Sequence, residues 1–508
     1  MLSLIYSAAI NGIEADIVEV ETYISSGMPV FSIVGLPDVA VKESRDRVTA
    51  AMKNSGFDFP SRKITVNLAP ADIKKEGGIF DLSIALGILA ANGKIRKENL
   101  RRFCAAGELS LDGKIRKVKG VLPISLSLQK NKIEDFIVPI ANRQEAAAAG
   151  KVNIFPFKTL AEIVKFINGE LNCEPYVYNA YDLDADSGID ADCDFVDVKG
   201  QKNARRSAEI AAAGSHNIIM SGPPGSGKTM IAKRIPGILP PMTFDEAVET
   251  TRIWSVSGRA FASGLIKRRT FRSPHHTSSA VALAGGGTYP RPGEVSLSHN
   301  GVLFLDEFAE FRRDALEVLR QPLEDKKITV SRAKDSFIFP ASFMLIAAMN
   351  PCPCGNLGHR EKECVCNPYQ VRKYQSRISG PLMDRIDIHV EVPALKFSEL
   401  SALNDDSESS VGIRERVVKA REIQNVRFLG SGIYANAQMQ AKEIKKYCVL
   451  GDDAFEILKT AVEKLNFSAR SYDKILKVSR TIADLDGSDV IKTNHIAEAV
   501  RYRFFDRV

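Results

Sequence analysis

The first 170 residues alternate between strand-like and helix-like stretches. Apolar and polar positions alternate over residues 17–23 and 63–68, which predicts two half-buried strands. Apolar positions recur every three or four residues over 39–52 and 80–91, which predicts two helices. Residues 107–115 are typical of a hairpin around an Asp-Gly turn. This pattern predicts a compact α/β domain.

A change of composition follows. Residues 181–194 contain six Asp and no basic residue, with no periodic apolar pattern. Such a segment buries too little apolar surface to fold alone, so residues 171–194 are predicted to be an acidic linker.

Four strand-like runs follow in the next 200 residues, and the more apolar ones are typical of buried parallel strands. They cover residues 217–220, 302–305, 343–349 and 388–392. Helices are predicted over 204–213 and 314–323, and a hairpin over 328–339. The pattern therefore predicts a parallel-sheet core.

After about residue 397 the apolar positions recur only with helical spacing. The predicted helices cover residues 411–428, 453–465, 469–485 and 492–503. An all-helical C-terminal region is expected.

The 508 residues are 44% hydrophobic and 26% charged, which is typical of a soluble globular protein. No apolar run approaches the length that crosses a bilayer, and the first basic residue is Lys42, unlike in a signal peptide. A cytoplasmic protein with no membrane partner is expected. The net charge of +7 permits nucleic-acid binding without requiring it.

Residues 222–229 read GPPGSGKT and fit the phosphate-binding pattern GxxxxGK[ST]. A predicted strand precedes them and a helical stretch follows, so backbone N–H groups would face the β-phosphate of ATP. An ordinary Gly/Pro turn is the alternative, which the order of strand, loop and helix disfavours. Lys228 would reach the β- and γ-phosphates, and Thr229 would ligate Mg²⁺. The predicted cofactor-binding residues are Gly222, Pro223, Pro224, Gly225, Ser226, Gly227, Lys228 and Thr229.

Polar side chains end two later strands. Asp306 and Glu307 follow residues 302–305, at the edge where parallel sheets place ligands. Asp306 would hold Mg²⁺ through its water, and Glu307 would polarise the attacking water. Asn350, after 343–349, is placed to sense the γ-phosphate. Downstream of the phosphate loop these residues predict ATP hydrolysis.

Four of the eight cysteines form the pattern C-x-C-x9-C-x-C within residues 352–366. Four thiolates suit tetrahedral Zn²⁺, although this spacing is tighter than usual. A structural zinc site is predicted at Cys352, Cys354, Cys364 and Cys366. The alternatives are four reduced cysteines, or a site in which His359 replaces one ligand.

Basic residues cluster in two places: Lys267, Arg268, Arg269 and Arg272, and then Arg332 and Lys334 at the hairpin tip. In a ring of subunits such loops can follow the phosphates of DNA. His275 and His276 are adjacent and rarely able to share one metal, so we interpret them as part of a substrate-facing loop. A solvated basic face is the alternative.

The front domain resembles the Lon-protease-like fold in the order and spacing of its elements. Active proteases of that fold use a Ser nucleophile and a Lys base. Here Phe80-Asp81 and Gly120-Val121-Leu122 stand where those residues are expected. We therefore expect no peptidase activity, and interpret the domain as a scaffold, an oligomerisation collar or a DNA-contacting module.

Six stretches closely resemble the ComM/YifB family of magnesium-chelatase-like AAA+ ATPases: residues 197–201, 222–229, 272–277, 301–308, 350–355 and 379–390. The resemblance extends over nearly the whole chain. It implies an α/β protein with a Lon-like domain (1–170), a linker (171–194), an AAA+ core (195–396) with a zinc insert (352–366), and a helical lid (397–508).

The same resemblance implies roles for three side chains. Asn350 matches the first sensor, Arg385 the arginine finger that acts on a neighbouring subunit, and Arg470 the lid arginine called sensor 2. An ordinary surface or helix-capping ion pair is the alternative for each arginine.

The family is similar to hexameric DNA motors, and its ComM branch promotes branch migration during natural transformation. The resemblance implies an ATP-driven homo-hexamer acting on single-stranded or branched DNA. A metal-insertion ATPase is one alternative, although the similar magnesium-chelatase subunit lacks the front domain and cysteine insert. A non-motor regulatory scaffold is the other.

Overall fold

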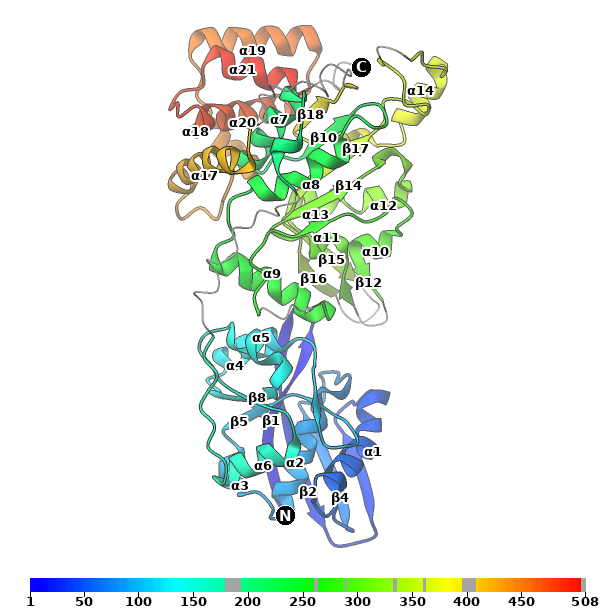
Figure 1. The fold of residues 1–508 in the computed structure, drawn as a ribbon, viewed down its shortest axis with the longest axis vertical. Helices are drawn as coiled ribbons and strands as arrows, with labels where there is room; N and C mark the ends of the chain where they lie inside the picture. The colour runs from blue at the N-terminus through cyan, green and yellow to red at the C-terminus, as the bar shows by residue number, and fades with distance from the viewer. Residues whose placement is uncertain are drawn as a thin grey trace. The chain divides into compact units, whose positions relative to one another are not determined.

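The computed structural model describes residues 1–178, 193–259, 264–287, 290–331, 336–359, 362–394 and 408–503. The chain forms two compact units, Met1–Ala185 with Thr243–Ile266, and Asp186–Met242 with Lys267–Val508 (Figure 1). Residues 179–192 of the predicted linker, and Arg332 and Lys334 of the predicted hairpin tip, lie outside the described residues.

A seven-stranded mixed sheet forms the centre of the first unit, in the order β3-β4-β2-β1-β5-β8-β9. Its longest pairing is the antiparallel hairpin β1–β2, in which Leu2 pairs with Tyr23 and Asn11 with Glu14. The strands are β1 (Leu2–Asn11), β2 (Glu14–Ser25), β3 (Val30–Val34), β4 (Lys63–Ala69), β5 (Phe103–Ala105), β8 (Asp135–Pro139) and β9 (Asn153–Phe157). The predicted strands 17–23 and 63–68 lie within β2 and β4.

Helices of this unit pack on the sheet, and every residue of α2 (Asp81–Ala91) is buried. The predicted Asp-Gly hairpin is formed by β6 (Glu108–Leu109) and β7 (Ile115–Arg116). The remaining helices are α1 (Val39–Asn54), α3 (Lys97–Leu100), α4 (Val121–Lys130), α5 (Arg143–Ala147) and α6 (Leu160–Asn168), with short 3₁₀ turns at Gly78–Phe80 and Ile140–Asn142.

The positions compared with the Lon-type dyad are buried. Phe80, Asp81 and Leu122 are all fully enclosed. The Asp81 carboxylate accepts hydrogen bonds from Arg47 Nε at 2.7 Å and from the Leu109 N–H at 3.3 Å. At the position where the resemblance to Lon-type proteases predicts a nucleophile, the structure therefore has an ion pair between Arg47 and Asp81.

Helix α9 (Phe244–Ser257) follows the phosphate-loop helix in sequence but packs within the first unit. Arg252 Nη2 contacts Glu14 Oε1 at 2.8 Å, and Ser255 Oγ donates to the buried Glu145 carboxylate. The span 195–396 predicted as the ATPase core thus contains a helix whose packing partners are in the front unit.

Ser255→Ala is expected to destabilise the protein, because Glu145 would lose a hydrogen-bond donor in a buried position. A hydrogen bond to a charged group typically contributes about 1.5–3 kcal/mol. Urea unfolding of the full chain measures the change. Ser257→Ala is the control, since the hydrogen bonds of Ser257 are local: its hydroxyl donates to the Trp254 carbonyl and accepts from the Arg259 N–H. Equal stability of the two variants would contradict a structural role for the Ser255 contact.

The second unit contains a five-stranded parallel sheet in the order β11-β14-β17-β10-β18. Strands β10, β14 and β17 bury every side chain, which explains why their sequences are continuous apolar runs. The strands are β10 (Ile218–Ser221), β11 (Phe271–Arg272), β14 (Val302–Leu305), β17 (Met344–Met349) and β18 (Ile388–Glu391).

Helices and small hairpins surround this sheet. The hairpins are β12–β13 (Gly285–Gly286 and Arg291–Pro292) and β15–β16 (Lys327–Ser331 and Ser336–Pro340). The helices are α7 (Lys202–Gly214), α8 (Lys228–Ile238), α10 (Ala280–Ala284), α11 (Glu294–Leu297), α12 (Arg313–Glu317), α13 (Arg320–Asp325), α14 (Pro368–Gln375) and α15 (Gly380–Met383), with 3₁₀ turns at Phe195–Asp197 and Phe308–Glu310.

The single helix predicted over residues 314–323 is wrong, because the structure has two short helices, α12 and α13. Pro322 has no N–H to donate to the carbonyl of Val318, so a continuous helix would lose that bond. In α13 the proline falls in the first turn, where its missing N–H costs nothing.

The C-terminal part is all helical, as predicted. It consists of α17 (Ser410–Arg427), α18 (Ala441–Tyr447), α19 (Asp452–Leu465), α20 (Ala469–Leu485) and α21 (Thr493–Arg501), with a 3₁₀ turn at Asn436–Gln438. These helices form one group beside α7 (Figure 1). Among the described helices, none combines the length and apolar character needed to cross a bilayer.

Candidate nucleotide-binding site

The predicted phosphate loop lies between β10 and α8, as strand, loop and helix. Gly225 and Gly227 have φ of +77° and +92°, which side chains with a Cβ rarely adopt. Ser226 Oγ is buried and has no hydrogen-bond partner among the residues that the structure describes. The loop and the first N–H groups of α8 therefore form a cradle suited to a phosphate.

Lys228 is folded back onto this loop. Its Nζ donates to the carbonyls of Gly222 and Pro223 at 2.7 and 2.9 Å and lies 3.5 Å from Asn350 Oδ1. Burial lowers the pKa of Lys228, and the Asp306 carboxylate opposes that shift. A phosphate in the cradle would replace the carbonyls with an anionic partner and favour the charged lysine.

The acidic residues meet the loop at the same sheet edge. Thr229 Oγ1 donates to Asp306 Oδ2 at 2.7 Å, so a hydroxyl and a carboxylate converge where Mg²⁺ is expected. The Glu307 N–H donates to Asp306 Oδ1 at 2.9 Å. The segments that follow three neighbouring strands, β10, β14 and β17, thus bring together Lys228, Thr229, Asp306 and Asn350.

Glu307 has a partner that the sequence analysis does not predict. His276 Nδ1 lies 2.8 Å from Glu307 Oε2. His276 comes from the loop after β11, and β11 pairs in parallel with β14 in the register Phe271 to Val302. Because both strands end at one edge, the loops that follow them meet.

Arg385 and Arg470 lie at the opposite edge of the sheet. Asp387 and Ile388 donate their N–H groups to the carbonyl of Asn217, which precedes β10. Arg385 pairs with Glu324 of α13, and Arg470 Nη1 lies 3.4 Å from Asp384 Oδ2. A four-residue strand, about 13 Å long at about 3.3 Å per residue, separates this edge from the phosphate loop. Neither arginine reaches the nucleotide loop of its own chain.

A buried ionic cluster supports that edge. Asp387 Oδ2 lies 3.3 Å from His216 Nδ1, and its Oδ1 lies 2.9 Å from Lys474 Nζ on α20. Burial opposes ionisation, but the Lys474 ammonium and the His216 ring hold the pKa of Asp387 well below its ordinary value. Burial lowers the pKa of Lys474 to about 8 despite the Asp387 charge. The cluster joins the helical region to the segment that carries Arg385.

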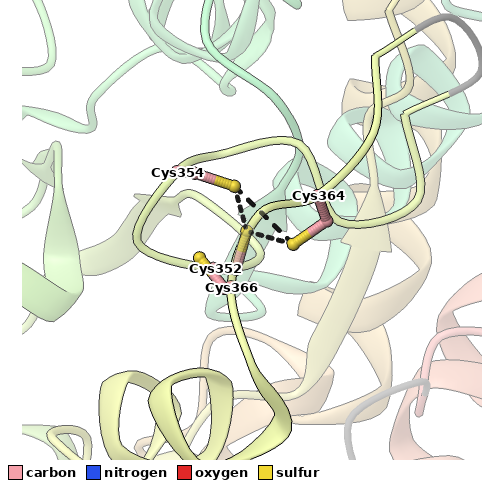
Figure 2. Close-up of side chains that lie close together, drawn as sticks. All are labelled: Cys352, Cys354, Cys364 and Cys366. Carbon is pink, nitrogen blue, oxygen red and sulfur yellow. Dashed lines mark hydrogen bonds between the residues drawn. The ribbon is translucent and has the colours of Figure 1, made fainter.

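The four clustered cysteines converge (Figure 2). Their ligand atoms all lie within 4.8 Å of one another, and Cys352 Sγ is 3.4 Å from that of Cys354 and 3.6 Å from that of Cys364. Four thiolates about 2.3 Å from one tetrahedral metal would be about 3.8 Å apart, so the cluster fits such an ion. Backbone hydrogen bonds from Asn356 and Val365 lower the pKa of the Cys354 thiol to about 6, whereas burial and the neighbouring thiols raise the pKa of Cys364 to about 12 and also raise that of Cys366.

His359 is not part of this metal-sized group. Its Nδ1 accepts a hydrogen bond from the Lys362 N–H at 3.1 Å. The insert also touches the phosphate loop, because a Cβ added at Gly355 would meet Pro224 Cδ at 2.6 Å. A metal held by the cysteines would therefore brace one side of the nucleotide site.

Two arginines of the first basic cluster form hydrogen bonds within the protein. Arg269 donates to the carbonyls of Pro240 and Asn300 at 2.6 and 2.8 Å, and Arg272 forms two hydrogen bonds with Glu294 at 2.6 and 2.8 Å. These two arginines stabilise the loop before His275. Their side chains are thus committed to internal contacts.

Family comparisons agree with this arrangement along the chain. Residues 194–400 match the family described as magnesium chelatase, subunit ChlI, residues 20–142 match subunit ChlI of Mg-chelatase, and residues 407–503 match the ChlI C-terminal family. The expected parallel-sheet core and helical C-terminal region are thus supported by both the structure and the comparisons.

Individual relatives match the whole length of the chain. The chain is 45% identical over 512 residues to competence protein ComM of Haemophilus influenzae, covering 100% of this chain and 98% of that protein. It is 41% identical over 507 residues to YifB of Salmonella typhimurium, with the same two coverages. A shorter match, 27% identical over 150 residues, covers 27% of this chain and 26% of Lon protease 2 of Bacillus subtilis.

The predicted fold class is confirmed: a Lon-like α/β front, a parallel-sheet AAA+ core and a helical C-terminal region. Family membership implies ATP and Mg²⁺ as cofactors, which the geometry around Lys228, Thr229 and Asp306 suits. With two relatives above 40% identity along the full chain, this protein belongs to the ComM/YifB family of magnesium-chelatase-like AAA+ ATPases.

Proposed function

We propose that this protein is an ATP-driven hexameric motor that moves branched or single-stranded DNA in the cytoplasm, and that it promotes branch migration during the integration of recombining or transforming DNA. The observation that carries the proposal is the separation of the site into two halves. Lys228, Thr229, Asp306 and Glu307 lie at one edge of the sheet, and Arg385 and Arg470 at the other.

A ring of identical subunits joins these two halves. A head-to-tail interface can place the arginine edge of one subunit against the phosphate loop of the next, and such interfaces close into rings. An arginine supplied in this way stabilises the charge that develops on the transferred phosphoryl group. The similarity to a competence protein supports DNA as the substrate.

The β15–β16 hairpin is the element we assign to DNA. Its strands pair from Lys327–Pro340 to Ser331–Ser336, and Ile338, opposite Thr329 midway along the hairpin, is exposed. In sequence Arg332 and Lys334 form its tip. Six copies around a channel would each attract the phosphates of DNA weakly, and together they would bind the DNA much more tightly than one copy.

Junction displacement tests this function. Wild type is expected to separate forked duplexes and migrate four-way junctions with ATP, and Lys228→Ala is expected to do neither. DNA binding should weaken steeply with salt and depend little on sequence. Arg332→Glu with Lys334→Glu should retain ATPase activity but lose junction movement. An ATPase-active hexamer that moves no junction and gains no rate from DNA would contradict the motor and favour the regulatory scaffold.

We further propose that the ion held by Cys352, Cys354, Cys364 and Cys366 is zinc with a structural role. Purified protein is expected to contain about one zinc per chain, and Cys352→Ser with Cys354→Ser to contain almost none. Because Gly355 packs on Pro224, the double variant should also bind ATP more weakly.

Elemental analysis and ATP titration measure the two effects. Cys173→Ser is the control, since Cys173 lies in the first unit and outside the cluster. Protein purified without chelators that carries no zinc would contradict the assignment.

A further inference from the structure

A buried amide side chain holds the backbone of the segment that carries Arg385. Asn217 Nδ2 donates to the Arg385 carbonyl at 3.1 Å, and Asn217 Oδ1 accepts from the N–H of Leu345 in β17 at 2.9 Å. Because a backbone N–H only donates and a carbonyl only accepts, these two partners fix the direction of the amide. Asn217 is only 7% exposed, and a hydrogen bond lost from such a site is poorly replaced by water.

The main chain of Asn217 contacts the same segment. Its carbonyl accepts from the N–H groups of Asp387 and Ile388 at 3.0 Å each, and its own N–H donates to Asp387 Oδ2 at 3.3 Å. Asn217 directly precedes β10, a fully buried strand that pairs in parallel with β17 on one side and β18 on the other. Asn217 is therefore fixed at the amino end of a central strand, and its amide extends this anchor to the backbone of Arg385.

The Arg385 side chain needs a fixed backbone in order to act outside its own chain. The guanidinium pairs with Glu324, and Arg385 Nε is buried without a hydrogen-bond partner among the residues that the structure describes. Once the side chain leaves Glu324, the position of the backbone determines where the guanidinium can reach. The next carbonyl, that of Ile386, accepts from the buried Arg503 Nη1 at 2.7 Å. Two successive carbonyls are thus held by two different side chains, and Asn217 holds the carbonyl of Arg385 itself.

We propose that Asn217 is a positioning residue for Arg385, whose amide fixes the backbone from which the guanidinium reaches the ATP bound by the neighbouring subunit. The inference rests on the proposed function, in which Arg385 acts across a subunit interface. Catalysis by a positioned group is sensitive to displacements of about 1 Å, so loss of the amide lowers turnover in the neighbour's site. Lys228 and Thr229, which follow the other end of β10, keep their own contacts.

ATP turnover and ATP titration of the full-length protein measure this effect. Asn217→Ala is expected to lower kcat about tenfold, the rate equivalent of one hydrogen bond, and to change the affinity for ATP by less than about twofold. Gln424→Ala is the matched control, because Gln424 is a fully buried amide that donates to the Ala213 carbonyl at 3.1 Å and accepts from the Asn436 N–H at 2.9 Å. Both of these partners lie outside the Arg385 segment, so kcat should stay within about twofold of wild type.

Mixtures of variants show which ATP site Asn217 serves. An Asn217→Ala subunit keeps its own Glu307 but presents a displaced arginine. Mixing it with Glu307→Gln, which supplies a well-placed arginine, should raise turnover about fivefold above the sum of the two separate variants. Mixing it with Arg385→Ala should give no such gain, because neither subunit then supplies a well-placed arginine. If Asn217 only supported the ATP site or the fold of its own chain, the two results would be exchanged.

A second variant covers the case in which Asn217→Ala does not fold. Asn217→Asp has the same shape and keeps an acceptor for the Leu345 N–H, but its ionised carboxylate cannot donate to the Arg385 carbonyl. It should therefore lower kcat and should regain turnover with Glu307→Gln alone.

The mixture of Arg385→Ala with Glu307→Gln is the reference for these results. If this reference recovers, an unchanged kcat in both Asn217 variants, or any pattern other than recovery with Glu307→Gln alone, overturns the inference and leaves the role of Arg385 intact. If the reference does not recover although subunits exchange, the action of Arg385 on a neighbour is overturned, and the inference falls with it.

Discussion

Glu307→Gln is expected to bind ATP normally and to hydrolyse it about 10²- to 10⁴-fold more slowly than wild type, the usual contribution of a general base. The substitution keeps the size of the side chain but removes the negative charge that we propose polarises the attacking water. Lys228 and Thr229 are untouched, so the phosphate cradle remains. Single-turnover hydrolysis and nucleotide titration on the same preparation separate the two effects.

Lys228→Ala should be defective in ATP binding, the step that precedes hydrolysis. The phosphates lose their cation, and no described side chain near the loop replaces the Nζ that lies 2.7 to 3.5 Å from Gly222, Pro223 and Asn350. Loss of ATP binding is therefore expected, measured by the same titration.

Glu310→Gln is the matched control for Glu307→Gln. It removes a carboxylate three positions further along the same segment, which pairs with Arg377 at 2.5 Å rather than with His276. Near-normal turnover is expected. A Glu307→Gln enzyme as fast as this control would remove Glu307 from the role of general base.

The elements predicted well are those set by local sequence. Buried strands such as β14 and β17 are continuous apolar runs, and α20 begins and ends at the predicted residues 469 and 485. The phosphate loop follows from glycines that adopt positive φ between a strand and a helix. Each of these signals lies within a few residues of the element that it predicts.

The features that could not be predicted depend on which elements become neighbours. The buried face of α9, with Ala247 and Trp254, indicates that the helix is packed but not against which unit. His276 meets Glu307 only because β11 lies beside β14, and β11 has just two residues, Phe271 and Arg272, too short for an apolar pattern. The interpretation of His275 and His276 as part of a substrate-facing loop does not include this contact with Glu307.

The position of Arg385 also could not be predicted from the local sequence. Its motif indicates a catalytic arginine, while its place at the amino edge of the sheet emerges only from the pairing of β18 with β10. In the single chain its guanidinium is turned to Glu324 and its side chain is only 12% exposed. Reaching a neighbouring subunit requires that this pair be broken.

If Arg385 has the proposed role of an arginine finger, Arg385→Ala is expected to lower ATP turnover about 10³- to 10⁵-fold while leaving ATP binding intact. Activity should return when this variant is mixed with Glu307→Gln. In a random equal mixture, about a quarter of the interfaces of a cyclic ring combine an intact Glu307 with an intact Arg385. Turnover of the mixture, compared with the sum of the two separate variants, measures the recovery.

The control for this mixture is a double variant with both Glu307→Gln and Arg385→Ala. Mixed with Arg385→Ala it offers no intact arginine, so no recovery is expected even if subunits exchange freely. Recovery in the first mixture alone would assign Arg385 to the site of a neighbour. If subunit exchange is demonstrated and neither mixture recovers, Arg385 does not act across an interface, and its contact with Glu324 is then the better account of why an arginine stands there.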